Sequence, residues 1–169
     1  MKKFALTIAL ATLSLAAVCQ RSPVDDLFDR YNGKEGFTSV FISSKMFSLL
    51  ARIDSEDKEF QDLVTRIRSI KILSIDSAAN VTGINFCNDL LKKLSSSGYE
   101  ELMTVKEENS EVRFMILEIN GRIAELVMVT GGYGSSVVSI SGNLDLKSIA
   151  SLSDKIGIEE LEGLEKVKQ

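Results

Sequence analysis

The sequence predicts a single α+β domain, in which helices pack on a mostly antiparallel sheet of five to six strands. The main observation is the stretch from Glu111 to Gly142, which consists of three strand-like runs separated by two turn signals. The first signal, Asn120-Gly121, is the dipeptide most typical of a tight hairpin, because both central residues of a type I′ turn need positive φ. Helical and strand-like patterns also alternate between residues 37 and 107, which predicts helices packed against the sheet.

The two turns also predict which side chains share a face of the sheet, because a slip of one residue would exchange the faces. With a two-residue loop, the facing pairs are Ile119–Arg122, Leu117–Ala124, Met115–Leu126 and Arg113–Met128. The other face is then rich in valine and carries Val112, Phe114, Ile116, Val127 and Val129. If the glycine-rich loop has four residues, Val138 lies beside Val127 and Ile140 beside Glu125. We expect the valine face to be the main core side, and helices or a partner to cover the methionine face.

Residues 1–19 have the form of a secretory signal peptide, with Lys2 and Lys3 before an apolar run from Phe4 to Ala17. That run is too short for a typical membrane span. Two processing outcomes remain open. Ala17 and Cys19 suit a cleavage before Gln20, whereas Cys19 is also in place to carry the lipid of a lipoprotein. The predicted location is the periplasm or cell envelope, with outer-membrane association only if Cys19 is lipidated.

The mature composition excludes some functions. Loss of residues 1–19 leaves 150 of 169 residues, and the loss of two lysines leaves 18 basic against 24 acidic residues, a balance of −6. This acidic balance argues against a nucleic-acid partner. Cleavage before Gln20 leaves Cys87 as the one cysteine, so an internal disulfide is impossible. The apolar neighbours of Cys87 predict a buried, inert thiol.

The N-terminal elements follow in order. Residues 20–36 form a polar segment, either a short helix beginning near Asp25 or a tether, and the domain proper is predicted at 37–169. Phe37 to Ile42 is typical of a strand. Ser43 then suits the N-cap of a helix over 44–53. The predicted buried side of this helix consists of Met46, Phe47, Leu49 and Leu50. A second helix is predicted at 55–66, with Phe60, Leu63, Val64 and Ile67 in one apolar stripe.

The remaining elements complete the sheet. A strand at 69–76 has apolar residues on both faces, which indicates a central position. A helix at 84–94 then leads to a strand at 99–107, and would form a crossover if the two strands are parallel. Asn143 or Asp145 is the predicted cap of a further helix that contains Leu146, Ile149 and Leu152. A last, weak helix contains Leu161 and Leu164.

No catalytic, cofactor-binding or metal-binding residue is predicted. The chain has no histidine, which removes the usual general base and most zinc sites. The acidic residues Asp54, Glu56, Asp57 and Glu59 lack the spacing of a calcium loop. The pairs Glu100–Glu101 and Glu107–Glu108 point to opposite faces of a strand, and Glu118 approaches Glu125 only at the rim of the sheet. The loop at 131–136 joins two strands and lacks the lysine of a phosphate-binding loop.

The sequence resembles a known family in several segments, which are Phe37–Val40, Ser43–Phe47, Tyr99–Met103, Val105–Glu107, Ile116–Gly121, Gly132 and Ser139–Leu146. In these it is similar to the domain of unknown function 4252 family, small exported proteins of Gram-negative bacteria. The resemblance implies no activity, cofactor or catalytic residue. It implies export, commonly with a cleavage before Gln, and hints at a role in envelope response, since family genes can lie beside those of alternative sigma factors.

The sequence therefore predicts a non-enzymatic cell-envelope protein that acts by binding a protein partner or by self-association. An alternative is a periplasmic carrier of a small apolar ligand or lipid, with a pocket formed by Met103, Met115, Leu126 and Met128. A hydrolytic enzyme is the last alternative. Another open form is a lipoprotein anchored through Cys19.

Overall fold

The computed structural model describes residues 21–53, 58–76, 79, 81, 83–132 and 134–145. Several predictions fall outside these residues. They are the signal peptide at 1–19 with Cys19, the residue Gln20, the acidic residues 54, 56 and 57, residue 133 of the loop predicted at 131–136, and the helices predicted after residue 145. Asn143 lies within a strand and is not a helix cap, so the prediction that named it is wrong.

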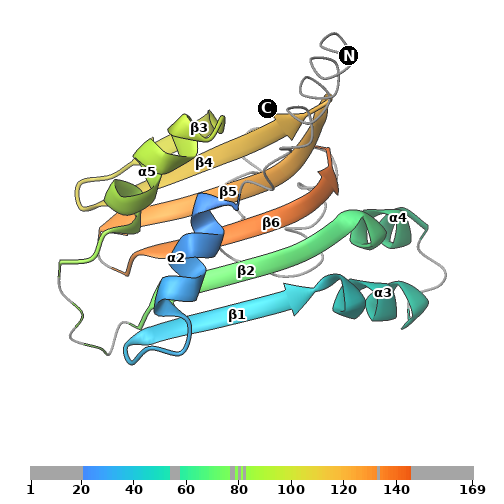
Figure 1. Cartoon of the computed structure of the whole chain (residues 1–169), viewed down its shortest axis with the longest axis horizontal. Coiled ribbons are helices and arrows are strands. Elements are labelled where there is room, and N and C mark those ends of the chain that lie inside the picture. Colours follow the sequence, from blue (N-terminus) through green and yellow to red (C-terminus); the bar gives the residue numbers. More distant parts are fainter. Residues whose placement is uncertain are drawn as a thin grey trace, which may run out of the picture.

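The described part of the chain forms one six-stranded sheet in which every neighbouring pair is antiparallel (Figure 1). This confirms the predicted α+β fold. The strands are β1 (Phe37–Ser43), β2 (Ile67–Ile75), β3 (Glu100–Lys106), β4 (Ser110–Ile119), β5 (Arg122–Gly132) and β6 (Ser136–Leu144). Their order across the sheet is β1-β2-β6-β5-β4-β3, so β2 is an inner strand, as its two apolar faces predicted.

Four helices are described: α2 (Pro23–Tyr31), α3 (Ser44–Ile53), α4 (Lys58–Arg66) and α5 (Phe86–Ser96). Helix α5 lies on the connection from β2 to β3. Strand β3 runs in the same direction as β2, but it forms the edge of the sheet opposite to β1. The connection therefore crosses three strands. In Figure 1, α2 and α5 lie over the same face of the sheet, and α3 continues from the end of β1.

The sequence allows either a helix or a tether for residues 20–36, and the structure contains a helix, α2. Ser22 caps α2 by accepting from the backbone N–H of Val24, and Pro23 occupies its first turn, where no N–H is needed. Val24, Leu27 and Phe28 are buried. The packed fold therefore begins N-terminal to residue 37.

Two apolar cores lie on opposite faces of the sheet. The α3/α4-side core contains buried residues from those helices and the strands, among them Phe47, Leu63, Val64, Ile70, Phe114, Leu126, Met128, Val138 and Ile140. The α2/α5-side core contains, among others, Val24, Leu27, Phe86, Cys87, Leu90, Leu94, Tyr99, Met115, Val127 and Val129. Side chains alternate along each strand, so every strand contributes to both faces. The buried residues show that each face is covered at its own core.

The predicted hairpin register is correct only next to the turn. Asn120 and Gly121 both have positive φ, 54° and 73°, and Ile119 faces Arg122 as expected. The register then shifts by one residue between Leu117 and Glu118, because Ala124 is an extra residue on β5. This is the arrangement of a β-bulge. Beyond it, the predicted pairs of Leu117 with Ala124, Met115 with Leu126 and Arg113 with Met128 are wrong.

The shift exchanges the faces that the sequence predicted. Leu117 faces Glu125, Met115 faces Val127 and Arg113 faces Val129. Phe114 faces Met128 and belongs to the α3/α4-side core, although it was predicted on the valine face. The second hairpin differs in the same way, since Val138 lies beside Met128 and Ile140 beside Leu126. Met115 is therefore separated by the sheet from Leu126 and Met128.

Candidate functional site

Glu125 is the most unusual polar residue of the described structure, because its side chain is 6% exposed within β5. The register shift at Ala124 points it to the α2/α5 side, where Leu117 and Ser141 are its strand neighbours. A buried carboxylate is costly unless hydrogen bonds satisfy it. The surroundings of Glu125 must therefore supply donors.

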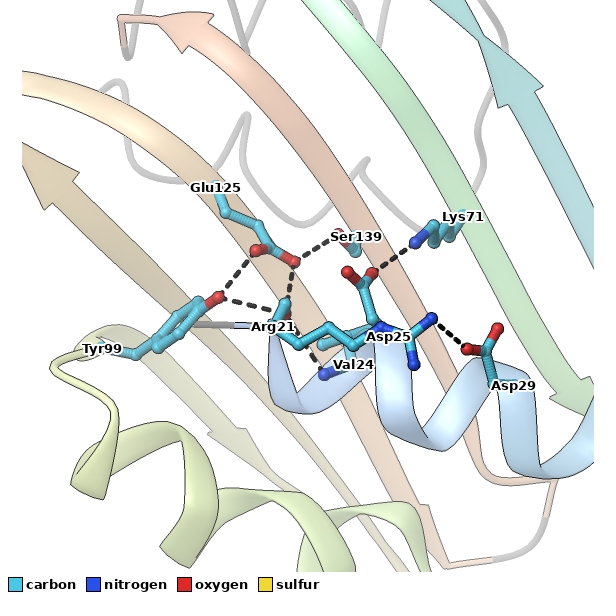
Figure 2. A network of polar contacts seen from close by, with 9 residues as sticks. Arg21, Val24, Asp25, Asp29, Lys71, Tyr99, Glu125 and Ser139 are labelled. Atoms are coloured by element: carbon cyan, nitrogen blue, oxygen red, sulfur yellow. Dashed lines mark hydrogen bonds and ion pairs between the residues drawn. The ribbon is translucent and has the colours of Figure 1, made fainter. Parts of the chain in front are cut away.

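Three hydroxyl groups from different parts of the chain donate to this carboxylate (Figure 2). Tyr99, which follows α5, donates to Oε2 at 2.6 Å. Ser139 of β6 donates to Oε1 at 2.5 Å, and Ser22, the cap of α2, donates to Oε1 at 3.1 Å. The hydroxyls of Ser22 and Tyr99 also lie 3.1 Å apart. We call these four residues the Glu125 network.

The Glu125 network connects distant elements of the fold. Burial, and then the negative charge of Glu125, raise the pKa of the Tyr99 phenol above its usual value, so it stays a neutral donor. Both carboxylate oxygens already accept hydrogen bonds, which suits an anchor for the start of α2. Close by, an ion pair between Asp25 and Lys71 joins α2 to β2 (Figure 2).

Two cavities of about 310 and 320 Å³ lie among the described residues. The larger is beside the Glu125 network and is lined by Arg21, Arg68, Ser97 and Ser141 together with Leu117 and Ile119. The smaller lies by the turn between β3 and β4, where Glu107 and Glu108 line it. Neither is lined by Met103, Met115, Leu126 or Met128, and Met115 lies across the sheet from two of these. The predicted methionine pocket is therefore wrong.

Cys87 is buried on α5, as the sequence predicted. Its Sγ approaches the backbone oxygen of Val129 at 3.7 Å. Burial, and to a lesser extent the charge of Glu111, raise the pKa of the thiol to about 11. A thiol with that pKa is protonated near pH 7, so inertness remains the expectation for Cys87.

Glu107 and Glu108 lie beyond the end of β3 and line the same cavity, so the prediction that they point to opposite faces of a strand is wrong. Glu118 and Glu125 do not form a joint site. Glu118 faces Ile123, whose side chain belongs to the α3/α4-side core, whereas Glu125 points to the other side. The bulge thus separates them, although the sequence placed both at the rim of one face. Within the described ranges, no group of three potential metal ligands occurs, and no helix is long and apolar enough to cross a membrane.

Exposed apolar side chains gather in one part of the chain. Among the described residues, six large apolar side chains are exposed. Four of them, Val40, Phe41, Met46 and Leu49, lie on β1 and α3, and we call them the β1–α3 surface. Phe41 is 57% exposed, more than any other of the six. Met46 and Leu49 were predicted to be buried, and that prediction is wrong.

Sequence reasoning found neither the Glu125 network nor the β1–α3 surface. The signal for the first was a lone carboxylate between apolar residues of a strand, but its hydroxyl partners are 14 to 103 residues away in the chain. The signal for the second was an apolar strand without charged residues.

Comparison with known proteins gives one match. The model of a family described as "Domain of unknown function (DUF4252)" matches residues 31–152, as the resemblance suggested. The search of curated proteins and the search of solved structures each gave no match. The match covers β1 to β6 and includes both the β1–α3 surface and Glu125.

Proposed function

The chain belongs to the family described as "Domain of unknown function (DUF4252)", and from this premise we propose that it is an exported, non-enzymatic protein of the cell envelope that binds a protein partner through the β1–α3 surface. The leader-like N-terminus and the acidic mature balance support export and argue against nucleic acid as the partner. The absence of histidine from the sequence supports binding over catalysis.

The observation that carries this proposal is that four of the six exposed large apolar side chains among the described residues lie on the edge strand β1 and on α3, which follows it. Val40 and Phe41 are neighbours in the strand and point to opposite faces, so both flank the same edge. Exposed apolar groups that lie together are typical of protein interaction sites. Two of these residues, Val40 and Phe41, lie on an edge strand, whose outer backbone N–H and C=O groups are able to pair with a strand of another chain. Among the described residues, β1 pairs with β2 alone.

A photoreactive amino acid in place of Phe41 tests the proposal in cells of the source organism. Irradiation is expected to give a covalent adduct with a protein, because residue 41 is 57% exposed on the edge strand. The matched control places the same group at Val105, which is 42% exposed on the opposite edge strand. Equal labelling at both positions, or none at residue 41, would overturn the proposed surface.

The location is tested by the intact mass of the protein purified from its own host. A mass that begins at Gln20 gives a diffusing exported protein, and a mass with acyl chains on Cys19 gives a membrane-anchored one. A mass that retains residues 1–19 without modification would contradict export.

A further inference from the structure

We infer that the partner is a second copy of this chain, which pairs its β1 with β1 of the first copy, antiparallel, about a twofold axis through Val40. This inference rests on the proposed function, since it names the occupant of the same surface. A twofold axis makes the interface self-complementary, which is the commonest arrangement in soluble dimers.

The first argument is that β1 lacks the charged residues, proline and bulge by which many edge strands avoid pairing. Edge strands usually avoid pairing by means of charged residues, proline or a bulge. The seven residues Phe37–Ser43 contain no charge, proline or glycine. Their register with β2 runs without a shift from Phe37 to Ser43, so the strand is regular along its whole length.

The second argument concerns the register that a twofold pair allows. Outward-facing backbone groups alternate along an edge strand, so a residue that faces outward must lie opposite another that does. An axis through a residue satisfies this condition, whereas an axis between residues does not. Val40 is the central residue of β1, so an axis there pairs all seven residues.

The third argument is the match of side chains in that register. Phe41 lies opposite Ser39 of the second copy, and Ile42 lies opposite Thr38, so large groups face small ones. Val40 meets its own copy, a pair of β-branched side chains that suits a sheet. Like charges do not meet, since β1 carries none. Beyond the strand, exposed Glu35 of one copy comes to the same end of the pair as exposed Lys45 of the other.

The test uses a full chain with Val40→Cys under mild oxidation. The twofold register brings the two Cys residues directly opposite each other, so a disulfide-linked dimer is expected. Phe41→Cys is the matched control, because residue 41 lies opposite residue 39, and two such Cys residues are offset by two positions, about 7 Å along the strand. The parent chain under the same oxidant reports any dimer formed by Cys19 or Cys87.

A second pair of variants tests the pairing without oxidation. Val40→Lys places two like charges at the axis and is expected to raise the dimer dissociation constant at least tenfold in sedimentation equilibrium. Val105→Lys makes the same change at a similarly exposed site on β3 and is expected to change it less than twofold. Urea unfolding of both variants checks that each is folded.

The outcomes separate this inference from the proposed function. Cross-linking at residue 40 alone, with dissociation by Val40→Lys, supports the twofold pair. A monomeric parent, or equal cross-linking at residues 40 and 41, overturns it. If the photoreactive group at residue 41 labels a different protein, self-pairing fails while the proposed surface stands. If it labels nothing, both fail.

Discussion

The two edges of the sheet present opposite surfaces. At one edge, β1 is uncharged, regular and apolar, with Phe41 and Val40 exposed. At the other edge, β3 begins with Glu100 and Glu101, ends with Lys106, and its register with β4 shifts between Glu101 and Met103. Arg113 reaches from β4 to form an ion pair with Glu101 at this edge.

This difference indicates which edge is protected and which is available. Charges and bulges on an edge strand discourage pairing with another chain. The β3 edge has both, even though Val105 is exposed there. One exposed apolar side chain is therefore not enough to make an edge available for pairing. The difference lies in the charge and regularity of the strand.

The largest effect on stability is expected from a residue away from both edges. This variant tests whether pairing through the β1 edge is independent of the overall stability of the fold. Glu125→Ala leaves the hydroxyls of Tyr99, Ser139 and Ser22 without their acceptor, and should lower the free energy of unfolding by about 3 kcal/mol. Urea unfolding measures it. Glu118→Ala, an exposed glutamate on β4, is the control and should change stability by less than about 0.5 kcal/mol. Cross-linking through a cysteine at residue 40 should persist in the folded fraction of Glu125→Ala. Loss of this cross-linking would show that pairing of β1 depends on the overall stability of the fold.

A smaller effect is expected from making the β3 edge resemble the β1 edge. In a Val40→Lys background, where β1 is blocked, Glu101→Thr removes a charge and frees Arg113 from one of its two acidic partners. Self-association should strengthen about tenfold, or about 1.4 kcal/mol, in sedimentation experiments. Glu108→Thr removes a charge from the adjoining turn and should not change association. If both variants change self-association equally, the net charge of the protein and not the charge on the edge strand controls association.

The smallest effect is a change of stability with pH. It tests whether the Glu125 network, which lies away from both edges, contributes to the stability of the fold at alkaline pH. Tyr99 has a raised pKa in the folded chain, so its contribution is complete below the usual tyrosine pKa near 10 and declines as pH rises above it. From pH 8 to pH 10.5 this loss should be roughly 1 kcal/mol. Tyr99→Phe should be less stable at pH 8 but lose less on the same change of pH. An equal loss in both proteins would assign the alkaline sensitivity to other groups.

The fold could be predicted because its signals are local. The turn at Asn120-Gly121 and the alternation in β4 to β6 depend on neighbouring residues, and the predicted helix 44–53 has the observed bounds of α3. The register could not be predicted, because one extra residue at Ala124 changes every later pair and has no strong signature in the sequence. Local pattern thus predicts the elements and misses how they align.

The site was less predictable, because it depends on contacts between distant segments. The Glu125 network joins residues 22, 99, 125 and 139, which no spacing rule relates. Met46 and Leu49 occupy apolar helix positions but are exposed, on a helix that begins directly at the end of an edge strand. Amphipathic spacing predicts an apolar stripe without stating how much of it is covered.

The cap at Ser22 has a consequence for how the protein would stand on a membrane. Its hydroxyl is held by Glu125, and Cys19 is only three residues upstream. At about 3.5 Å per extended residue, an acyl chain on Cys19 would begin within roughly 11 Å of this fixed point. A lipidated form would therefore be attached to the bilayer through a very short linker. The start of α2 would lie nearest the bilayer, and the domain would have little rotational freedom.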